Sequence, residues 1–331
     1  MGQDYPFVSV IVLNYNGLRF LDDCFQSLEK IDYPNFEVVM VDNRSTDGSV
    51  KYVKENYGWI RVIEAPENNG FAYGNNIGIR NTKGKYVYLL NNDTICTPDF
   101  LTRVVEEAEL DPTIGIAGSW PLDYKYRQYK DDALRFYAHL RHKTAQVSAV
   151  AGAVMLIRRD ALDKIGLLDK KYFLYWEDAE FCWRATLMGY KVVMVYDSFV
   201  YHLVNATGLP TKKRWMYEFV KNKIYTHIKL MNWRNLCLFL CSEILRSIGR
   251  MLRNPVLATS VLKGWWWNLR NLKISLMERK KIRSAKKIRD KDLIELIRRD
   301  DKLNKRDLKK LSELAEKDRK IMNTLDTQKD K

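Results

Sequence analysis

The sequence predicts an α/β fold in which a mostly parallel sheet is followed by a helical C-terminal extension. Over the first 95 residues, short runs rich in β-branched residues alternate with stretches of helical periodicity. This alternation is typical of a parallel sheet with right-handed crossovers. After about residue 210 the chain becomes basic and helical in pattern. Its 331 residues are enough for one large α/β domain and an extension.

The elements follow from short apolar runs bounded by turn-forming residues. The predicted strands are Phe7–Leu13, Phe36–Val41, Trp59–Glu64, Tyr86–Leu90, Val147–Ile157 and Lys191–Tyr196. The predicted helices run from the Asn-rich turn at 14–17 to about Lys30, and over Ser45–Tyr57, Gly70–Asn81 and Glu177–Gly189.

Polar side chains follow three of these strands. They are Asn14-Tyr15-Asn16, Asp42-Asn43 and Asn91-Asn92-Asp93. In open parallel sheets, ligands bind beyond the carboxyl ends of the strands. The sequence therefore predicts a binding site at this edge of the sheet.

Charge is unevenly distributed along the chain. Residues 1–210 hold 23 basic and 27 acidic side chains, whereas residues 211–331 hold 33 and 14. An anionic partner is therefore expected at the C-terminal part. The five cysteines show no CxxC pair and no zinc-ligand spacing, which indicates reduced thiols in a cytosolic protein. No signal peptide and no membrane-spanning run is predicted.

Four segments resemble family 2 glycosyltransferases of the GT-A fold, especially the rhamnosyltransferase-like branch. They are VSVIVLNYNG (8–17), VVMVDNRSTDGS (38–49), NNGFAYGNNIGI (68–79) with YLLNND (88–93), and FLYWEDAEFCWRATLMGY (173–190). Their order and spacing match the family, and the resemblance covers roughly residues 6–230. It implies a GT-A domain, inverting sugar transfer and a nucleotide-sugar donor.

Asp42 is a candidate for nucleotide recognition. A carboxylate at a strand end can accept the imide N–H of uracil or thymine in a charge-assisted hydrogen bond. The structural alternative is a turn residue that caps the next helix. Capping is equally expected for Asp47, and Tyr15 is expected either to flank the base or to pack in its loop.

Asn91-Asn92-Asp93 stands where the family carries its acidic metal motif, DxD in strict form. Asn replaces the first acid, so Asp93 is the expected carboxylate ligand of Mg²⁺ or Mn²⁺. One carboxylate can suffice because these ions also accept phosphate oxygens and water. His202 resembles the family's late metal-ligating histidine. The alternatives are a turn aspartate and a structural histidine.

Glu177-Asp178 is the expected catalytic pair. An inverting transfer needs a general base that takes the proton of the acceptor hydroxyl, and the family places the base on the second acid. Asp178 is therefore the first choice and Glu177 the second, with helix N-capping as the structural alternative. Glu180 and Arg184 are expected to form an ion pair. The further substrate-binding candidates are Asn14, Tyr15, Asn16, Asp42, Asn43, Gly70, Asn75, Asn92, Gly152 and Trp176.

Residues 211–289 hold 20 basic and three acidic side chains and five of the nine tryptophans. Basic and aromatic residues around apolar stretches predict helices that lie on an anionic membrane surface. The alternative is a soluble helical extension, and no motif supports nucleic-acid binding. Residues 290–331 are nearly balanced in charge and predict a solvated tail or a helix that self-associates into a homo-oligomer.

The predicted organisation is a catalytic domain over 1–210, a basic membrane-docking region over 211–289 and a charged helical tail over 290–331. The predicted function is transfer of a sugar from dTDP-rhamnose or a UDP-hexose to a glycan or lipid-linked acceptor. This would place the protein in cell-surface polysaccharide assembly, at the inner face of the membrane. Two alternatives stay open: a sugar nucleotidyltransferase, and a non-catalytic nucleotide-sugar-binding module.

Overall fold

The computed structural model describes residues 5–123, 144–203 and 211–303. The chain divides into two compact units, residues 1–288 and residues 289–331. Residues 290–303 of the second unit are helical, and the rest of the predicted tail lies outside the described residues. The expected boundary near residue 289 coincides with this division, whereas that at residue 210 falls inside the first unit.

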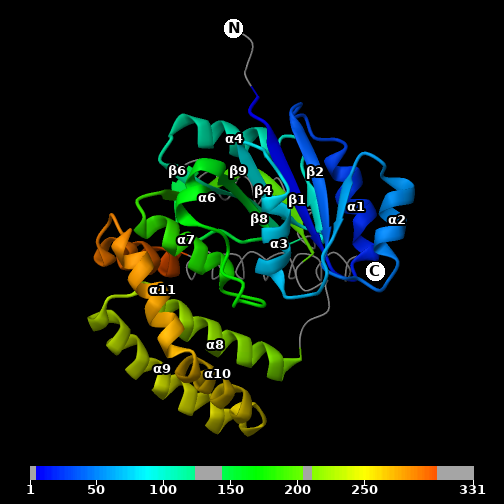
Figure 1. Cartoon of the computed structure of the whole chain (residues 1–331). Helices are drawn as coiled ribbons and strands as arrows, with labels where there is room; N and C mark the ends of the chain where they lie inside the picture. Colours follow the sequence, from blue (N-terminus) through cyan, green and yellow to red (C-terminus); the bar gives the residue numbers. More distant parts are fainter. Residues whose placement is uncertain (1–4, 124–143, 204–210, 304–331) are drawn as a thin grey trace, which may run out of the picture. The chain divides into compact units, whose positions relative to one another are not determined.

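Within the described residues, nine strands form one sheet in the order β3-β2-β1-β4-β8-β6-β9-β5, with β7 paired to β9. Strands β3, β2, β1 and β4 are parallel neighbours. Strand β8 is antiparallel to both β4 and β6, so β6 runs in the direction of β4, and β9 is parallel to β6. The expected mostly parallel α/β sheet is confirmed (Figure 1). The strands are β1 (Val8–Asn14), β2 (Phe36–Asp42), β3 (Arg61–Glu64), β4 (Tyr86–Asn91), β5 (Thr94–Cys96), β6 (Ile114–Asp123), β7 (Thr144–Gln146), β8 (Val154–Arg158) and β9 (Lys191–His202).

Both faces of the sheet are covered by helices because its central strands are apolar on both sides. In β4, Tyr86, Tyr88 and Leu90 join one buried cluster, while Val87 and Leu89 join the other. The first cluster includes α1 (Leu18–Leu28), α2 (Ser49–Asn56) and α4 (Phe100–Leu110), and the second includes α3 (Phe71–Arg80), α6 (Arg159–Ile165) and α7 (Glu177–Leu187). This continuous burial explains why the strand runs are nearly unbroken stretches of apolar residues.

The predicted strand over Val147–Ile157 is wrong in its first half. Only β8, from Val154 onward, is a strand in this segment, and Val147 and Val150 are buried outside regular structure. Small apolar residues in a row indicate burial, but they do not distinguish a strand from a packed loop.

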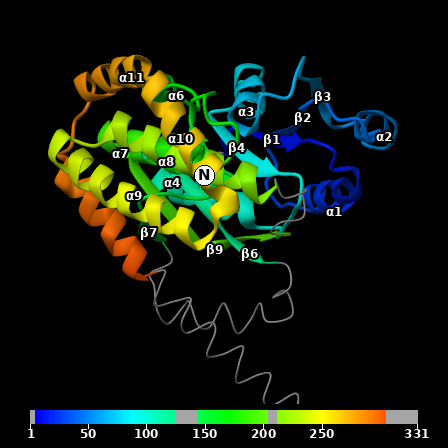
Figure 2. The ribbon, with the colours of Figure 1, turned by 90° about the horizontal axis from the view of Figure 1, so that it is seen from below.

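The C-terminal helices form a layered extension. They are α8 (Lys212–Leu230), α9 (Trp233–Arg253), the short 3-10 helix η2 (Pro255–Leu257), α10 (Ala258–Arg270) and α11 (Leu272–Ser284). Helix α8 packs against α7 of the catalytic part and against α9, α10 and α11 (Figure 2). A side chain at Gly264 would lie 3.0 Å from the backbone of Lys221, so α10 crosses α8 closely. No helix in the described part of the chain is long and apolar enough to cross a membrane.

Candidate active site

Asn14 joins the ends of three parallel strands. Its Nδ2 donates to Asp42 Oδ1 at 2.9 Å and to Ser49 Oγ at 2.8 Å, and its Oδ1 accepts from Asn92 Nδ2 at 2.7 Å. Asn14 and Asp42 are register partners on β1 and β2, while Asn92 follows β4. The polar residues that end the three strands therefore form one connected edge, as the sequence predicts.

Asp42 lies inside this edge. Its carboxylate accepts hydrogen bonds from Asn14 Nδ2 and from the Ser45 N–H at 2.8 Å, and only 2% of the residue is exposed. An ionised carboxylate has about four acceptor positions, so two engaged positions still leave capacity for a ligand donor. Tyr15 is 49% exposed beside it. Their contacts with a nucleobase stay a prediction.

Asn16 and Asp47 brace the loops around this edge. Asn16 is in the left-handed region with φ 49°, and its Oδ1 accepts from the Thr46 N–H at 2.8 Å. Asp47 accepts from the Leu18 N–H at 2.9 Å and from the Ser49 N–H at 3.1 Å, at the starts of α1 and α2. Although partial burial opposes it, these donors hold the pKa of Asp47 below its usual value. Asp47 thus accepts from the first N–H of both helices, although the cap positions themselves are Gly17 and Gly48.

Gly70 permits a close approach of two backbones. It has φ 90°, and a side chain there would lie 2.1 Å from Phe173 O. The Phe71 N–H donates to the same carbonyl at 2.8 Å, so the first helical N–H of α3 is already engaged. Asn43 Nδ2 donates to Asn68 Oδ1 and to Gly70 O, while the buried Oδ1 atoms of Asn43 and Asn75 have no hydrogen-bond partner. These two oxygens are available acceptors next to the strand ends.

Asp93 and His202 lie together, as a metal site requires. Asp93 Oδ1 is buried, accepts no hydrogen bond and lies 3.2 Å from His202 Nε2. Two neighbouring ligands of an octahedral ion with bonds of about 2.1 Å would be about 3 Å apart, so the spacing fits Mg²⁺ or Mn²⁺. The described residues hold no group of three or more Asp, Glu, His and Cys side chains suited to a metal. The remaining ligands would therefore come from phosphate oxygens and water.

Buried Glu177 and partly buried Asp178 begin helix α7 as a pair of adjacent carboxylates. Asp178 Oδ2 accepts from the Gly152 N–H at 3.3 Å, and Oδ1 accepts from the Ala179 N–H at 2.7 Å. Burial raises the pKa of Asp178, although these N–H groups oppose the rise. Burial and then the Asp178 carboxylate raise the pKa of Glu177 well above its usual range, and its Oε2 has no hydrogen-bond partner. Both carboxylates therefore have a raised pKa, so Asp178 is more basic than an exposed aspartate.

Gly152 approaches the catalytic pair closely. A side chain there would lie 3.0 Å from the Phe71 ring and 3.5 Å from Asp178 Cβ. The sequence predicts either close passage of this backbone by the donor sugar or acceptor, or a packing glycine, and its neighbours in the structure are Phe71 and Asp178. Contact of Gly152 with a substrate stays a prediction.

The two residues before the pair have left-handed backbones. Tyr175 has φ 68° and Trp176 φ 73°, which is unfavourable for bulky residues. Buried Asn222 of α8 holds this turn, since its Nδ2 donates to Leu174 O at 2.9 Å and to Tyr175 O at 2.8 Å. The Trp176 ring packs edge-on against Trp183 and Phe219. The substrate contact expected of Trp176 stays a prediction. Its ring also joins the turn over residues 174–176, which we call the catalytic turn because it leads to the proposed base, to α8.

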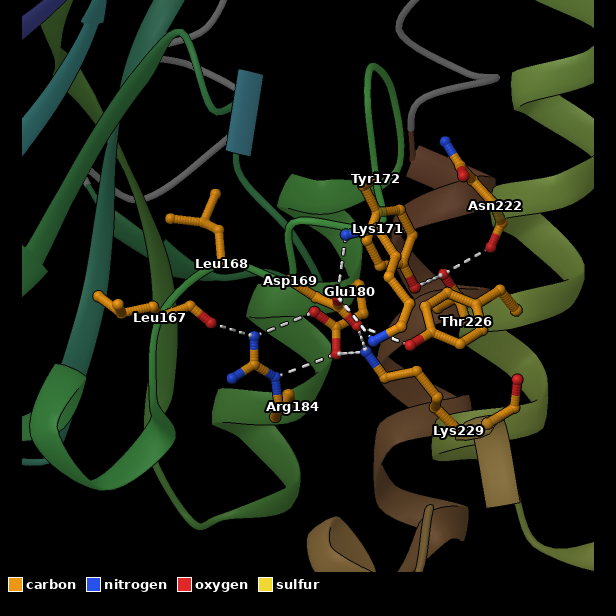
Figure 3. Close-up of polar contacts among 12 residues, drawn as sticks. Leu167, Leu168, Asp169, Lys171, Tyr172, Glu180, Arg184, Asn222, Thr226 and Lys229 are labelled. Carbon is orange, nitrogen blue, oxygen red and sulfur yellow. Dashed lines mark hydrogen bonds and ion pairs between the residues drawn. The ribbon is translucent and has the colours of Figure 1, made fainter. Parts of the chain in front are cut away.

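A buried ionic cluster secures α7 to α8 (Figure 3). Arg184 makes a two-pronged contact with Glu180 at 3.0 and 3.1 Å, which confirms the expected ion pair. Lys229 of α8 reaches Glu180 at 2.9 Å and Asp169 at 2.7 Å. Although burial opposes ionisation, Arg184 and Lys229 hold the pKa of Glu180 below its usual value, and Lys229 does the same for Asp169.

Asn222 and Lys229 are functional candidates that sequence reasoning missed. A signal was present, because Asn222, Thr226 and Lys229 recur at helical spacing on one face of α8. Thr226 shares a hydrogen bond with Tyr172 at 2.7 Å, so this whole polar face meets the loop before α7 (Figure 3). Because the segment is rich in Lys and Arg, the sequence alone does not distinguish this buried polar face from a solvated helix face.

Comparison with known sequences places the chain among sugar-transferring enzymes. Residues 9–166 match the family described as Glycosyl transferase family 2. An uncharacterized glycosyltransferase of Haemophilus influenzae is 25% identical in an alignment of length 266 that covers 70% of this chain and 79% of that protein. A poly-beta-1,6-N-acetyl-D-glucosamine synthase of Staphylococcus aureus is 24% identical over 56% of this chain, which spans 47% of the synthase.

Solved structures agree on the fold. A mannosyltransferase from Pyrobaculum calidifontis, in complex with GDP-Man and Mn²⁺, has a TM-score of 0.55 at 19% identity, covering 80% of this chain and 88% of that one. S. aureus TarS 1-349 has a TM-score of 0.51 at 18% identity, covering 68% and 66%. The GT-A fold implied by the sequence motifs is thereby confirmed, while the rhamnosyltransferase-like branch stays a prediction.

Proposed function

From the match of residues 9–166 to glycosyl transferase family 2, we propose that the chain is a metal-dependent, inverting glycosyltransferase of this family. The observation that carries the proposal is the carboxylate pair of buried Glu177 and partly buried Asp178 at the start of α7, where Asp178 accepts from the Gly152 N–H and has a raised pKa. The strand-end network around Asn14 and Asp42 supports a nucleotide-sugar site on the same edge. The proposed donor is dTDP-rhamnose or a UDP-hexose.

In the proposed reaction, the oxygen of the acceptor hydroxyl attacks C1 of the sugar, and Asp178 takes the proton of that hydroxyl. The bond from C1 to the diphosphate oxygen breaks, and the nucleoside diphosphate leaves. Asp93 and His202 would hold Mg²⁺ or Mn²⁺, which neutralises charge on the departing diphosphate. The Gly152 N–H fixes the orientation of the Asp178 carboxylate.

Incubation with a panel of nucleotide sugars and Mn²⁺, read as released nucleotide by mass spectrometry, tests the donor class. Release from a dTDP or UDP sugar is expected, and it should disappear with EDTA. Release from no donor, together with no donor binding by calorimetry, would contradict the proposal. Binding without release would instead favour a non-catalytic binding module.

The C-terminal helices support a second part of the proposal, docking on an anionic membrane to reach a lipid-linked acceptor. On α9, Leu238, Leu245 and Leu252 recur every seven residues and are 62%, 71% and 77% exposed. On α10, Leu262, Trp266 and Leu269 form a similar exposed row. Exposed apolar rows within a strongly basic region are typical of helices in a membrane interface.

A further inference from the structure

A cavity of about 630 Å³ lies between α8 and α10, apart from the catalytic edge. We call it the α8–α10 pocket. Its lining combines four cationic side chains with hydroxyl and aromatic groups, and it includes no acidic residue. The lining residues are Lys213, Arg214, Tyr217, Thr259, Ser260, Lys263, Trp266, Trp267 and Arg270.

Most of the positive charge in this pocket is uncompensated. Within the described part of the chain, Lys213, Lys263 and Arg270 make no ion pair with a carboxylate, and Arg214 lies 3.7 Å from Glu218. Glu218 in turn lies 2.6 Å from Lys221. Several cations around a cavity repel one another, so the arrangement favours an anion with several oxygen acceptors, such as a phosphate.

The pocket opens beside an apolar surface. Lys263, Trp267 and Arg270 follow one face of α10 at helical spacing, while Leu262, Trp266 and Leu269 follow the adjacent face and are 57%, 62% and 64% exposed. Trp266 belongs to both the pocket and the apolar row. A ligand with an anionic head and a hydrocarbon tail would therefore meet matching surfaces along one helix.

We propose that the α8–α10 pocket binds the terminal phosphate of a lipid headgroup, with the hydrocarbon chain along Leu262, Trp266 and Leu269. The inference rests on the membrane docking proposed above. It adds that docking is selective for lipids whose headgroup ends in a phosphate. The pocket also touches the catalytic part, because the Arg214 guanidinium lies 4.4 Å from the centre of the Phe173 ring, in the loop that leads to Glu177-Asp178. A lipid phosphate held there would lie against the elements that carry the proposed base.

Vesicle flotation of the full chain tests this proposal. Phosphatidylcholine vesicles carry either phosphatidic acid, whose phosphate is terminal, or phosphatidylglycerol, at matched surface charge. We expect roughly tenfold tighter binding to phosphatidic acid, the gain from one added charge-assisted contact. The double variant K263Q/R270Q should remove this preference. The matched control R253Q/K273Q removes two exposed charges outside the pocket and should weaken both bindings while keeping the ratio.

Two results would overturn the pocket assignment. One is wild-type protein that binds phosphatidic acid and phosphatidylglycerol vesicles equally. The other is a control, R253Q/K273Q, that loses the preference for phosphatidic acid as fully as K263Q/R270Q does. Tryptophan fluorescence provides the second arm. If inorganic phosphate changes the fluorescence with an affinity equal to that of phosphatidic acid, the lipid assignment is overturned in favour of a soluble anion. Failure to float with either vesicle would contradict membrane docking itself. Nucleotide release from the donor panel, measured on the same samples, tests sugar transfer separately.

Discussion

Asp93 and His202 show how few protein ligands this site offers to a metal. Replacement of Asp93 by Asn keeps the shape but removes the negative charge, so Mn²⁺-dependent donor binding should weaken roughly tenfold or more. Calorimetry with and without Mn²⁺ measures this. Asp47→Asn is a matched control, since Asp47 accepts from the first N–H groups of α1 and α2 and is not part of the proposed metal site, so its Mn²⁺ dependence should match that of the wild type. Equal Mn²⁺ dependence in the wild type and Asp93→Asn would remove the metal assignment.

The carboxylate pair separates into two roles that substitutions can distinguish. Asp178→Asn should reduce transfer by about 10²- to 10⁴-fold and leave donor affinity nearly unchanged, because the amide cannot accept the proton. Glu177→Gln should retain much more activity, since Asp178 stays in place as the proposed base. Single-turnover rates and donor calorimetry on both variants measure the difference. A larger loss of rate in Glu177→Gln would assign the base to Glu177.

The raised pKa of Glu177 also predicts a pH dependence of stability. A buried carboxyl with a folded-state pKa above its unfolded value contributes stability below the unfolded pKa, and this is lost as pH rises through the folded pKa. Glu177→Gln removes this loss. Melting temperatures of the variant should therefore gain on the wild type as pH rises above the unfolded-state pKa of a glutamate, about 4.3. A constant difference across this range would mean that Glu177 titrates normally.

At the scale of elements, helix α8 positions the catalytic turn through Asn222. Asn222→Ala removes both hydrogen bonds to Leu174 O and Tyr175 O, so the strained turn should relax and displace Asp178. Asn268→Ala is the matched control, because buried Asn268 also donates to two carbonyls, those of Lys221 and Gly264. Each change should destabilise the fold by about 1–3 kcal/mol. Only Asn222→Ala should lower kcat, and equal kcat in the two variants would reduce Asn222 to a packing role.

The exposed rows of α9 and α10 refine the membrane test. Of the run Trp265-Trp266-Trp267, Trp266 is 62% exposed, whereas Trp265 donates to Ser247 Oγ and Trp267 packs edge-on against Tyr225. Trp266→Ser with Leu269→Ser should therefore make vesicle binding more salt-sensitive without disturbing the fold. Flotation at low and high salt measures this. An unchanged salt profile would mean that these side chains do not enter the bilayer.

At the scale of the whole chain, the predicted elements and the clustering of polar strand ends agree with the structure wherever nearby residues or the strand register determine them. The alternating strands, Asn14 with Asp42, and the Glu180–Arg184 pair are all local or register-determined. The contact of Asn222 with Leu174 and Tyr175 was not predictable, since it joins residues 47 and 48 positions apart through tertiary packing. The start of β8 was misplaced because burial without alternation does not mark a strand boundary.

The division at residue 288 also has a testable consequence. A chain ending at residue 288 retains the whole first unit and should fold and transfer sugar normally. A chain ending at residue 210 lacks α8, which leaves Asp169 and Glu180 without Lys229 and should destabilise the fold by about 3–5 kcal/mol. Thermal melting and transfer assays on both chains measure this. Full activity of the shorter chain would contradict the structural role of α8.

The position of α8 in the sequence has a consequence for the timing of activity during synthesis. The strand ends that form the proposed donor edge lie within the first 93 residues, whereas the carbonyls of Leu174 and Tyr175 are held from residue 222. A growing chain therefore contains the strand-end network before it contains the proposed metal ligand His202 and before Asn222 can hold the turn that precedes the proposed base. In the order of synthesis the strand-end network comes first, His202 follows, and α8 with Asn222 comes last, so the proposed site is complete only when α8 has been made.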